Sequence, residues 1–376
     1  MKLLFWQWNS FCGREIEKAL KKLGVDHDSV YYHPASFEED EKHRDFLDKA
    51  LSKGYDALLS VNFSTEAARM CEKHGCLYFS WIYDCPVNIV DREPMKSEFC
   101  RLFFFDSMQA ERASSMGMKA FYLPLAADPS VFAAAASKGK PGKYDVSFVG
   151  NLYKSEYENY LKPLDDYSRG YLEGIVRSQS NLPYGYLIPE VVTEELTEKL
   201  NAFYRAAGGE KAEISRRQLI YLLACETTGR ARVTALKLLS GRFKTALWSS
   251  GKDERLSGVE VNPYTDYYDG MPAVFASSKI NLNISLKAIE AGIPLRVLDI
   301  ISCGGFVLTD WKMDMGEFFT PGESIETYSS LEELYAKTDF YVRNDEAREK
   351  VIGNARAVLD RAFRFEDRLG TILGTT

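Results

Sequence analysis

The chain has 376 residues, enough for about two domains at roughly 150 residues each. Hydrophobic residues make up 45% of the chain, charged residues 27%, and only 13 residues are proline, which excludes a disordered, collagen-like or disulfide-stapled protein. The 47 basic and 54 acidic residues give a net charge of −7 without a basic run, so neither nucleic acid nor a membrane surface is an expected partner.

The seven cysteines are odd in number, scattered and never spaced as Cys-x-x-Cys, which argues against a disulfide framework or a zinc ribbon. The apolar start of the chain lacks a small-residue cleavage site, and no apolar stretch reaches the roughly 18 residues of a membrane-spanning helix. We therefore expect a cytoplasmic protein without an export signal or a membrane span.

In the N-terminal part, short apolar segments typical of strands alternate with segments that have helical spacing. Strands are predicted at residues 2–8, 56–61, 77–82, 102–105 and 121–124, and helices at residues 14–23, at residues 65–73 and from Ser107 onward. This alternation predicts a parallel, doubly wound sheet.

Residues 133–142, AAAASKGKPG, change in composition to small residues, lysine, glycine and proline, which predicts an exposed linker. We expect an N-terminal α/β domain at residues 1–138 and a C-terminal α/β domain at residues 143–360. Residues 361–376 are expected to form a helix that packs back across the boundary.

In the C-terminal domain, a helix-rich insertion is expected near residues 152–228. Strands are predicted at residues 144–149, 244–249, 280–284 and 305–309, and helices at residues 231–239, 271–277 and 295–302. Arg230 and Arg232 are interpreted as solvated charges at the start of a helix. Two such sheets in tandem turn the carboxyl ends of their strands toward one cleft, where ligands bind.

The most informative segment is residues 281–310, NLNISLKAIEAGIPLRVLDIISCGGFVLTD. A strand is expected to end at Ser285, followed by a loop that carries Lys287, Glu290 and Gly292, and then by a helix whose first turn contains Pro294.

The start of that helix resembles an anion site suited to a diphosphate. The backbone N–H groups of Ile293, Leu295 and Arg296 are predicted to point into the cleft. Asp299, one turn further on, could accept hydrogen bonds from a ribose diol. The alternative is that Gly292-Ile-Pro merely starts a helix and that Asp299 is solvated.

Several segments together resemble a known family. They are FSWIYDCP (79–86), YLPLAAD (122–128), YDVSFVGNLY (144–153), VNPYTDYYDGMPAVFASSKINLNIS (261–285) and GIPLRVLDIISCGGFVLTD (292–310). In this order they resemble GT-B glycosyltransferases, and specifically the CgeB-like (spore maturation protein) family with its group 1 glycosyltransferase domain. The resemblance covers residues from about 55 to 370.

The resemblance implies a GT-B-like fold, with two doubly wound Rossmann-like domains facing a cleft. It also implies transfer of a hexosyl or related group from a nucleotide-sugar to an unknown glycan, protein or small-molecule acceptor, with retention of configuration. Group 1 transferases carry an acidic pair spaced eight apart in the donor site, and the second member holds the ribose. Asp299 matches that second member, whereas Glu290 lies nine residues before it and is a weaker candidate for the first.

The resemblance assigns further donor-side residues. Gly150, Asn151 and Lys154 fall where relatives have a Gly-Arg-x-x-x-Lys-like phosphate loop. The arginine of that loop is missing here, and we infer that Arg296 supplies its charge. Tyr264, after an expected strand, is a candidate to stack on the nucleotide base, unless its ring packs over the edge of the sheet.

On the acceptor side, Asp84 follows a predicted strand, and Pro86 turns the chain so that the carboxylate faces the cleft. It could act as a base toward an acceptor hydroxyl or hold the acceptor. The alternative is an aspartate that caps its own turn. Asn62 and residues 9–13 are second-rank acceptor candidates.

No cofactor or metal is expected. The four histidines form no ligand cluster, and Asp310 and Asp314 are spaced too widely for the DxD motif of metal-dependent transferases. The diphosphate charge would then be balanced by helix N–H groups, lysine and arginine. Because of the departures at Asn151 and Glu290, a catalytically inactive GT-B-fold binding or scaffold protein is the alternative function, and an epimerase finds no support.

Overall fold

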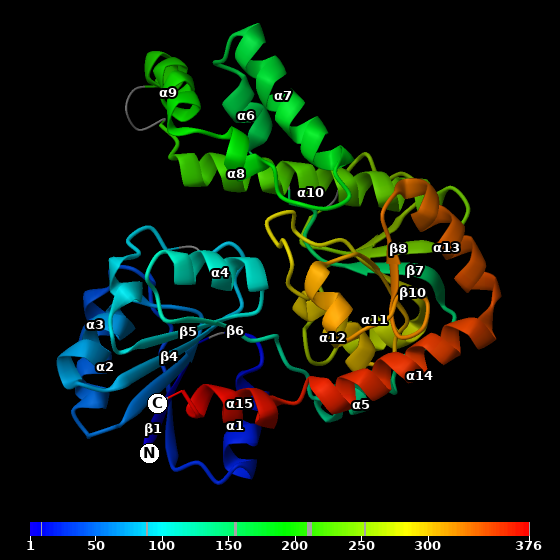
Figure 1. The fold of residues 1–376 in the computed structure, drawn as a ribbon. Coiled ribbons are helices and arrows are strands. Elements are labelled where there is room, and N and C mark those ends of the chain that lie inside the picture. The colour runs from blue at the N-terminus through cyan, green and yellow to red at the C-terminus, as the bar shows by residue number, and fades with distance from the viewer. Residues whose placement is uncertain (9, 88, 154–155, 209–212, 252, 376) are drawn as a thin grey trace.

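A computed structural model describes residues 1–8, 10–87, 89–153, 156–208, 213–251 and 253–375. Within these residues the chain forms two parallel six-stranded sheets, one in each half, with helices packed around them (Figure 1). The strand order is β2-β1-β3-β4-β5-β6 in the first sheet and β12-β11-β10-β7-β8-β9 in the second. The predicted pair of doubly wound α/β domains is confirmed.

The first sheet is built around β3, all of whose residues are buried, as expected for a central parallel strand with both faces covered. Its strands are β1 (Leu3–Gln7), β2 (His27–Tyr31), β3 (Ala57–Val61), β4 (Leu77–Ile82), β5 (Cys100–Phe104) and β6 (Ala120–Tyr122). Its helices are α1 (Gly13–Lys22), α2 (Glu41–Leu51), α3 (Thr65–His74), the 3-10 helix η1 (Glu93–Lys96) and α4 (Ser107–Ser115).

The second sheet has β7 and β10 at its centre, where their registers pair Ser278 with Tyr144 and Asn281 with Ser147. Its strands are β7 (Tyr144–Val149), β8 (Thr245–Trp248), β9 (Glu260–Asn262), β10 (Ser278–Asn283), β11 (Val307–Asp310) and β12 (Glu326–Tyr328). The elements around it are α11 (Met271–Ser277), α12 (Leu295–Ser302), the 3-10 helix η3 (Met313–Glu317), α13 (Leu331–Arg343) and α14 (Asp345–Ala362).

A helical segment after β7 stands above both domains in Figure 1. It consists of α6 (Tyr157–Leu161), α7 (Asp166–Asn181), α8 (Ile188–Val191), α9 (Glu194–Gly208) and α10 (Arg216–Ser240). Ser215 and Gln218 form a reciprocal capping box that starts α10. Gly229 lets this helix approach the loop after β7, since a Cβ there would lie 2.7 Å from the carbonyl oxygen of Leu152.

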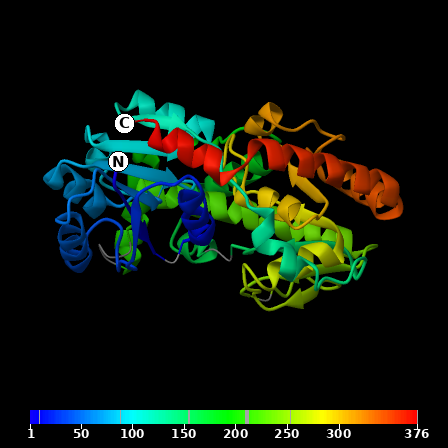
Figure 2. The same ribbon diagram turned by 90° about the horizontal axis from the view of Figure 1, so that it is seen from below.

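The C-terminal helices run from one domain to the other (Figure 2). α14 packs on α12, and α15 (Phe365–Leu373) then lies beside α1 of the first domain. Lys22 forms an ion pair of 2.5 Å with Glu366 at this contact. The Ala127 N–H also donates to the Phe363 carbonyl over 2.9 Å, so both connections between the domains are held together.

The expected linker is partly helical. Residues 133–136 belong to α5 (Pro129–Ala136), which Asp128 caps, and α5 packs against α11 and α12 of the second domain. The alanines that suggested a linker are therefore a helix, because alanine has the highest helix propensity. By its packing, α5 lies with the second domain, although it precedes the expected boundary at residue 138.

In the described part of the chain, no helix combines the length and the apolar character needed to cross a bilayer.

Candidate functional site

A cleft of about 570 Å³ lies between the two domains, at the carboxyl ends of β4, β7 and β10. Parallel sheets place their ligand sites at these strand ends. Three loops and two helices meet there. The polar or charged residues that line it are Tyr83, Asp84, Asn151, Tyr153, Arg217, Gln218, Tyr221, Arg232, Asn283, Ser285 and Arg296.

Asp84 reaches this cleft from the turn after β4. Asn62, which has a left-handed backbone (φ 61°), accepts the N–H groups of Tyr83 and Asp84 on its side-chain oxygen at 2.7 and 3.0 Å. Asp84 as a residue is exposed. Desolvation by the surrounding protein nevertheless raises the pKa of its carboxyl group, and Asn62 opposes that shift. Asn62 therefore positions the turn, and Asp84 faces the space between the domains.

Arg232 is the buried cation of the cleft, with only 8% of its surface exposed. Its guanidinium donates to the carbonyl oxygens of Ile284 and Asn151 and lies over the rings of Phe148 and Tyr153, 5.1 and 4.7 Å from their centroids. Among the described residues no carboxylate forms an ion pair with it. The expectation that Arg232 is a solvated surface charge is wrong, because it lies on the face of α10 that covers the sheet.

Arg296 lines the same cleft from α12, and Asp299 lies behind it. Asp299 is 2% exposed and receives hydrogen bonds from the Tyr267 hydroxyl at 2.7 Å and from Arg296 at 3.2 Å. Burial raises the pKa of Asp299 to about 6, although Arg296 and Tyr267 oppose this. The solvated alternative for Asp299 is therefore wrong, and its proposed contact with a ribose remains a prediction.

The loop before α12 does not offer all its N–H groups to a ligand. Asp106, the N-cap of α4 in the first domain, accepts the N–H groups of Glu290, Ala291 and Gly292 on one carboxylate oxygen, at 2.9, 3.0 and 3.0 Å. Gly292 also packs against Phe105. The part of the predicted anion site at Gly292 is thus occupied by the protein's own carboxylate, whereas Pro294, the N-cap of α12, lines the cleft.

Other predicted donor-side residues take different places. Gly150 and Asn151 line the cleft, whereas Lys154 lies outside the described residues. Lys287 is not among the described residues that line the cleft, and burial lowers its pKa while nearby Asp310 opposes the shift. Ile293 is buried in the core, and Leu295 packs against it.

Two candidates lie away from the cleft. Glu290 pairs with Arg112 and lines a second, neighbouring groove. Burial raises the pKa of Glu290, although Arg112 counteracts it. Tyr264 is 69% exposed on the loop after β9 and does not line the cleft.

A buried network behind the cleft orders the end of β10. Asp310 accepts the Ser285 N–H and hydroxyl, each at 2.8 Å, and lies 3.4 Å from the Lys312 amine. Burial opposes ionisation of Asp310, but Lys312, Lys287 and Ser285 together lower its pKa. Asp310 is therefore an anchor for Ser285. Within the described part of the chain, no three His, Cys, Asp or Glu side chains gather as a metal site.

The sequence did not indicate Arg217 or Asp106 as site residues, and it suggested that Arg232 is a solvated charge. A signal for Arg232 was available: Gly229, Leu236 and Leu239, which lie three residues before and four and seven residues after it, share its face of α10, and that face is buried. No comparable signal exists for Asp106, because its partners are 184 to 186 residues away.

Replacing Asp299 by asparagine should remove a pH dependence of stability. The pKa of Asp299 is about 6 in the folded chain, against an ordinary value of 3.8. The folded chain therefore keeps the carboxyl proton at pH values where the unfolded chain has lost it. The wild-type protein should therefore lose stability relative to Asp299→Asn as the pH rises from about 4 to 6, by about 3 kcal/mol.

Urea unfolding between pH 4 and 7 measures this difference. Asp166→Asn is the control, because its side chain is 102% exposed and its replacement should leave the slope unchanged. Identical pH slopes for the wild type and Asp299→Asn would show that the buried carboxyl does not titrate as described.

Residues 217–374 match the family model described as glycosyl transferase-like. An uncharacterized protein of Aquifex aeolicus is 26% identical over 147 residues, a match that covers 38% of this chain and 36% of that protein. The match thus spans about a third of the relative's length.

Solved structures resemble the chain over its whole length. HepE of Anabaena, solved with UDP and glucose, has 10% identity and a TM-score of 0.55, and the match covers 100% of both chains. Sucrose-phosphate synthase of Thermosynechococcus elongatus also gives 10% and 0.55, over 100% of this chain and 98% of that chain. A glycosyltransferase of Rickettsia africae gives 10% and 0.54, over 100% and 99%.

At this level of identity the structural likeness establishes the fold. The chain therefore has the two-domain α/β fold of GT-B glycosyltransferases, and its C-terminal part, residues 217–374, matches the glycosyl transferase-like family.

Proposed function

We propose that the protein is a glycosyltransferase that binds a nucleotide-sugar in the cleft and transfers its glycosyl group to an acceptor. The observation that carries this proposal is Arg232, a buried guanidinium that lines the cleft without an ion-pair partner among the described residues. Burying a cation is costly unless a negative charge compensates it. A diphosphate in the cleft would supply that charge.

Arg296 supports the same location for the donor. It lines the cleft together with Gly150 and Asn151, whose loop follows β7. Two guanidinium groups and a tight loop suit a diphosphate, since arginine binds phosphate oxygens by paired, charge-assisted hydrogen bonds. Asp299, bonded to Arg296, is our candidate to hold the ribose once the donor is bound.

The reaction breaks the bond between the anomeric carbon and the diphosphate oxygen and forms a bond from that carbon to an acceptor oxygen. Negative charge develops on the departing diphosphate, where Arg232 and Arg296 stabilise it. The acceptor proton leaves to Asp84 or to an oxygen of the departing diphosphate. The first route makes Asp84 a general base, and the second makes it a residue that holds the acceptor.

The finer parts of the proposal rest on the amino-acid sequence. Membership of the CgeB-like family, retention of configuration and independence of a metal are proposals that rest on the resemblance and on the missing DxD motif. The alternative, a GT-B-fold protein that binds nucleotides without catalysis, agrees with the departures at Asn151 and Glu290. Turnover of a donor separates the two functions.

UDP should bind to the cleft and raise the melting temperature, and EDTA should leave that shift intact. A ligand that binds only the folded state stabilises it by about 2.7 kcal/mol at a hundredfold excess over Kd. Arg232→Gln should weaken UDP binding by about 1.5–3 kcal/mol while changing uridine binding little, because a charge-assisted bond to phosphate is lost.

Calorimetry with UDP and uridine measures both affinities. Arg296→Gln provides a second variant with a less buried side chain, in case Arg232→Gln does not fold. If both variants lose as much affinity for uridine as for UDP, the diphosphate lies elsewhere. Loss of UDP binding in EDTA would rule out the metal-free proposal.

Asp84→Asn should reduce turnover far more than donor affinity, because asparagine keeps the shape of the side chain but cannot accept a proton or carry a charge. General-base catalysis contributes about 10²–10⁴ to the rate, so a loss above tenfold indicates proton transfer and a smaller loss indicates acceptor positioning. Release of UDP from UDP-sugars, measured as kcat with Kd for UDP, distinguishes these outcomes. An unchanged kcat, equal to that of the exposed-site control Asp166→Asn, would remove Asp84 from the mechanism.

A further inference from the structure

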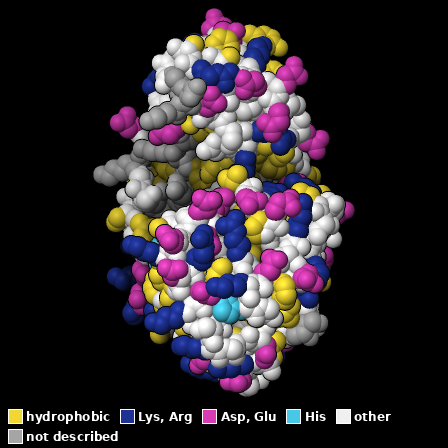
Figure 3. Space-filling model, turned by 90° about the vertical axis from the view of Figure 1, so that its left-hand side faces the viewer, with side chains coloured by type: hydrophobic (Ala, Val, Ile, Leu, Met, Phe, Trp, Pro, Cys, Tyr) yellow, Lys and Arg dark blue, Asp and Glu magenta, His cyan; other side chains and the backbone are white. Residues whose placement is uncertain are grey.

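A second groove of about 760 Å³ joins the donor cleft. It lies between the helical segment and the N-terminal domain, and Figure 3 shows a hollow between these two parts with hydrophobic side chains on its walls. Pro86, Val87 and Arg217 line both the groove and the cleft. A molecule in the groove can therefore extend one end toward Asp84, two residues before Pro86.

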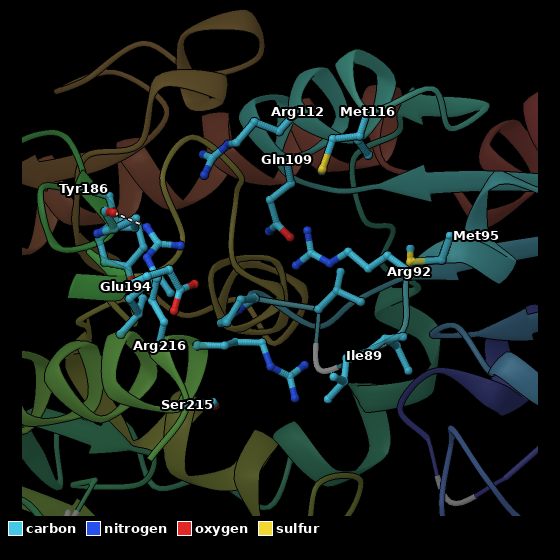
Figure 4. Close-up of a pocket in the computed structure, with 18 of the residues that line it drawn as sticks. Ile89, Arg92, Met95, Gln109, Arg112, Met116, Tyr186, Glu194, Ser215 and Arg216 are labelled. Atoms are coloured by element: carbon cyan, nitrogen blue, oxygen red, sulfur yellow. Dashed lines mark hydrogen bonds between the residues drawn. The ribbon is translucent and has the colours of Figure 1, made fainter. Parts of the chain in front are cut away.

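The groove contains positive charge that the protein does not neutralise. Arg217 has a buried Nη1 without a hydrogen-bond partner, and the described residues provide no ion pair for Arg217 or Arg92. Burial lowers the pKa of Arg92, and the nearby cations Arg217 and Arg112 lower it further, so these guanidinium groups face the same space. In Figure 4, Arg92 and Gln109 point toward one another across the middle of the pocket.

The acidic residues that line the groove either form ion pairs already or are exposed to solvent. Glu290 pairs with Arg112, and Glu198 pairs with Arg205 over 2.5 Å. Glu194 is exposed and lies close to Arg216 at the helical side in Figure 4. An orphaned buried donor on a cation indicates a missing acceptor, and an anion satisfies both its hydrogen bond and its charge.

The rest of the wall is apolar and rich in methionine. It is formed by Ile89, Met95, Phe104, Met116, Met118 and Ile220. Methionine side chains are flexible and polarizable, so they adapt to apolar groups of different shape. A neutral sugar chain, covered in hydroxyl groups, would leave these side chains poorly matched.

We propose that the groove binds the acceptor, and that the acceptor carries a carboxylate or phosphate group against Arg92 and Arg217 and an apolar portion along the methionine-rich wall. This inference rests on the proposed function, because it takes the adjoining cleft as the donor site. The diphosphate of the donor has its own arginines there, Arg232 and Arg296, so Arg92 remains for a second anion.

Calorimetry with octyl phosphate, octanoate and neutral octyl glucoside, all kept below micelle-forming concentrations, tests the proposal. The three probes carry unbranched alkyl chains of seven or eight carbons and differ in the charge of their head groups. We expect at least one anionic probe to bind at least tenfold more tightly than octyl glucoside. Comparison of octyl phosphate with octanoate shows which acidic group the site prefers.

Arg92→Gln is the decisive variant, because Arg92 lines the groove and not the cleft. It should weaken the preferred anionic probe at least tenfold, leave octyl glucoside unchanged and leave UDP binding unchanged. Arg177→Gln, an exposed arginine on α7, is the matched control and should change none of these affinities. Arg217→Gln should also weaken the anionic probe.

Equal affinity for anionic and neutral probes, or an unchanged anion affinity in both Arg92→Gln and Arg217→Gln, would overturn the proposal. Failure of the proposed function looks different. In that case UDP does not bind to the wild type, while the anionic probe still binds in a manner that depends on Arg92.

Discussion

The carboxylate of Asp106 fixes the position of the donor-side loop against the N-terminal domain. Its Oδ2 accepts three consecutive N–H groups of residues 290–292, and its Oδ1 accepts the Gln109 N–H at 3.1 Å and so caps α4. Gly292 is required at this contact, because a Cβ there would lie 2.7 Å from the Phe105 ring. This side chain thus connects the two domains just before α12, which carries Arg296 into the cleft.

This constraint also decides which groups remain for ligands. Backbone N–H groups near a helix start are a common anion site, but here three of them already hold a carboxylate. Side chains offer further positive charge for a diphosphate, since Arg232 of α10 and Arg296 of α12 both line the cleft. The helical segment adds Arg217 where the cleft meets the neighbouring groove.

Much of the fold could be predicted because its elements are locally encoded. The bounds predicted for residues 144–149, 271–277 and 295–302 are those of β7, α11 and α12. The polar strand β2 was missed, since its residues HDSVY lie at the edge of the sheet and lack an apolar pattern.

The candidate site was predictable where a residue follows a strand, as Asp84 and Gly150 do. It was not predictable where tertiary packing decides the role. Arg232 looked like a surface charge until α10 was placed on the sheet, and Asp299 became a buried carboxyl only through its contacts with Tyr267 and Arg296. The groove at Arg92 needed the helical segment to be placed against the first domain, which no local pattern specifies.

The central claim is that the cleft between the domains binds the diphosphate of a nucleotide-sugar. A crystal structure of the protein with UDP tests it most directly. The account predicts that the diphosphate lies in the cleft with its oxygens in contact with the guanidinium groups of Arg232 and Arg296. A UDP molecule bound elsewhere, with both arginines still free of phosphate, would contradict the account.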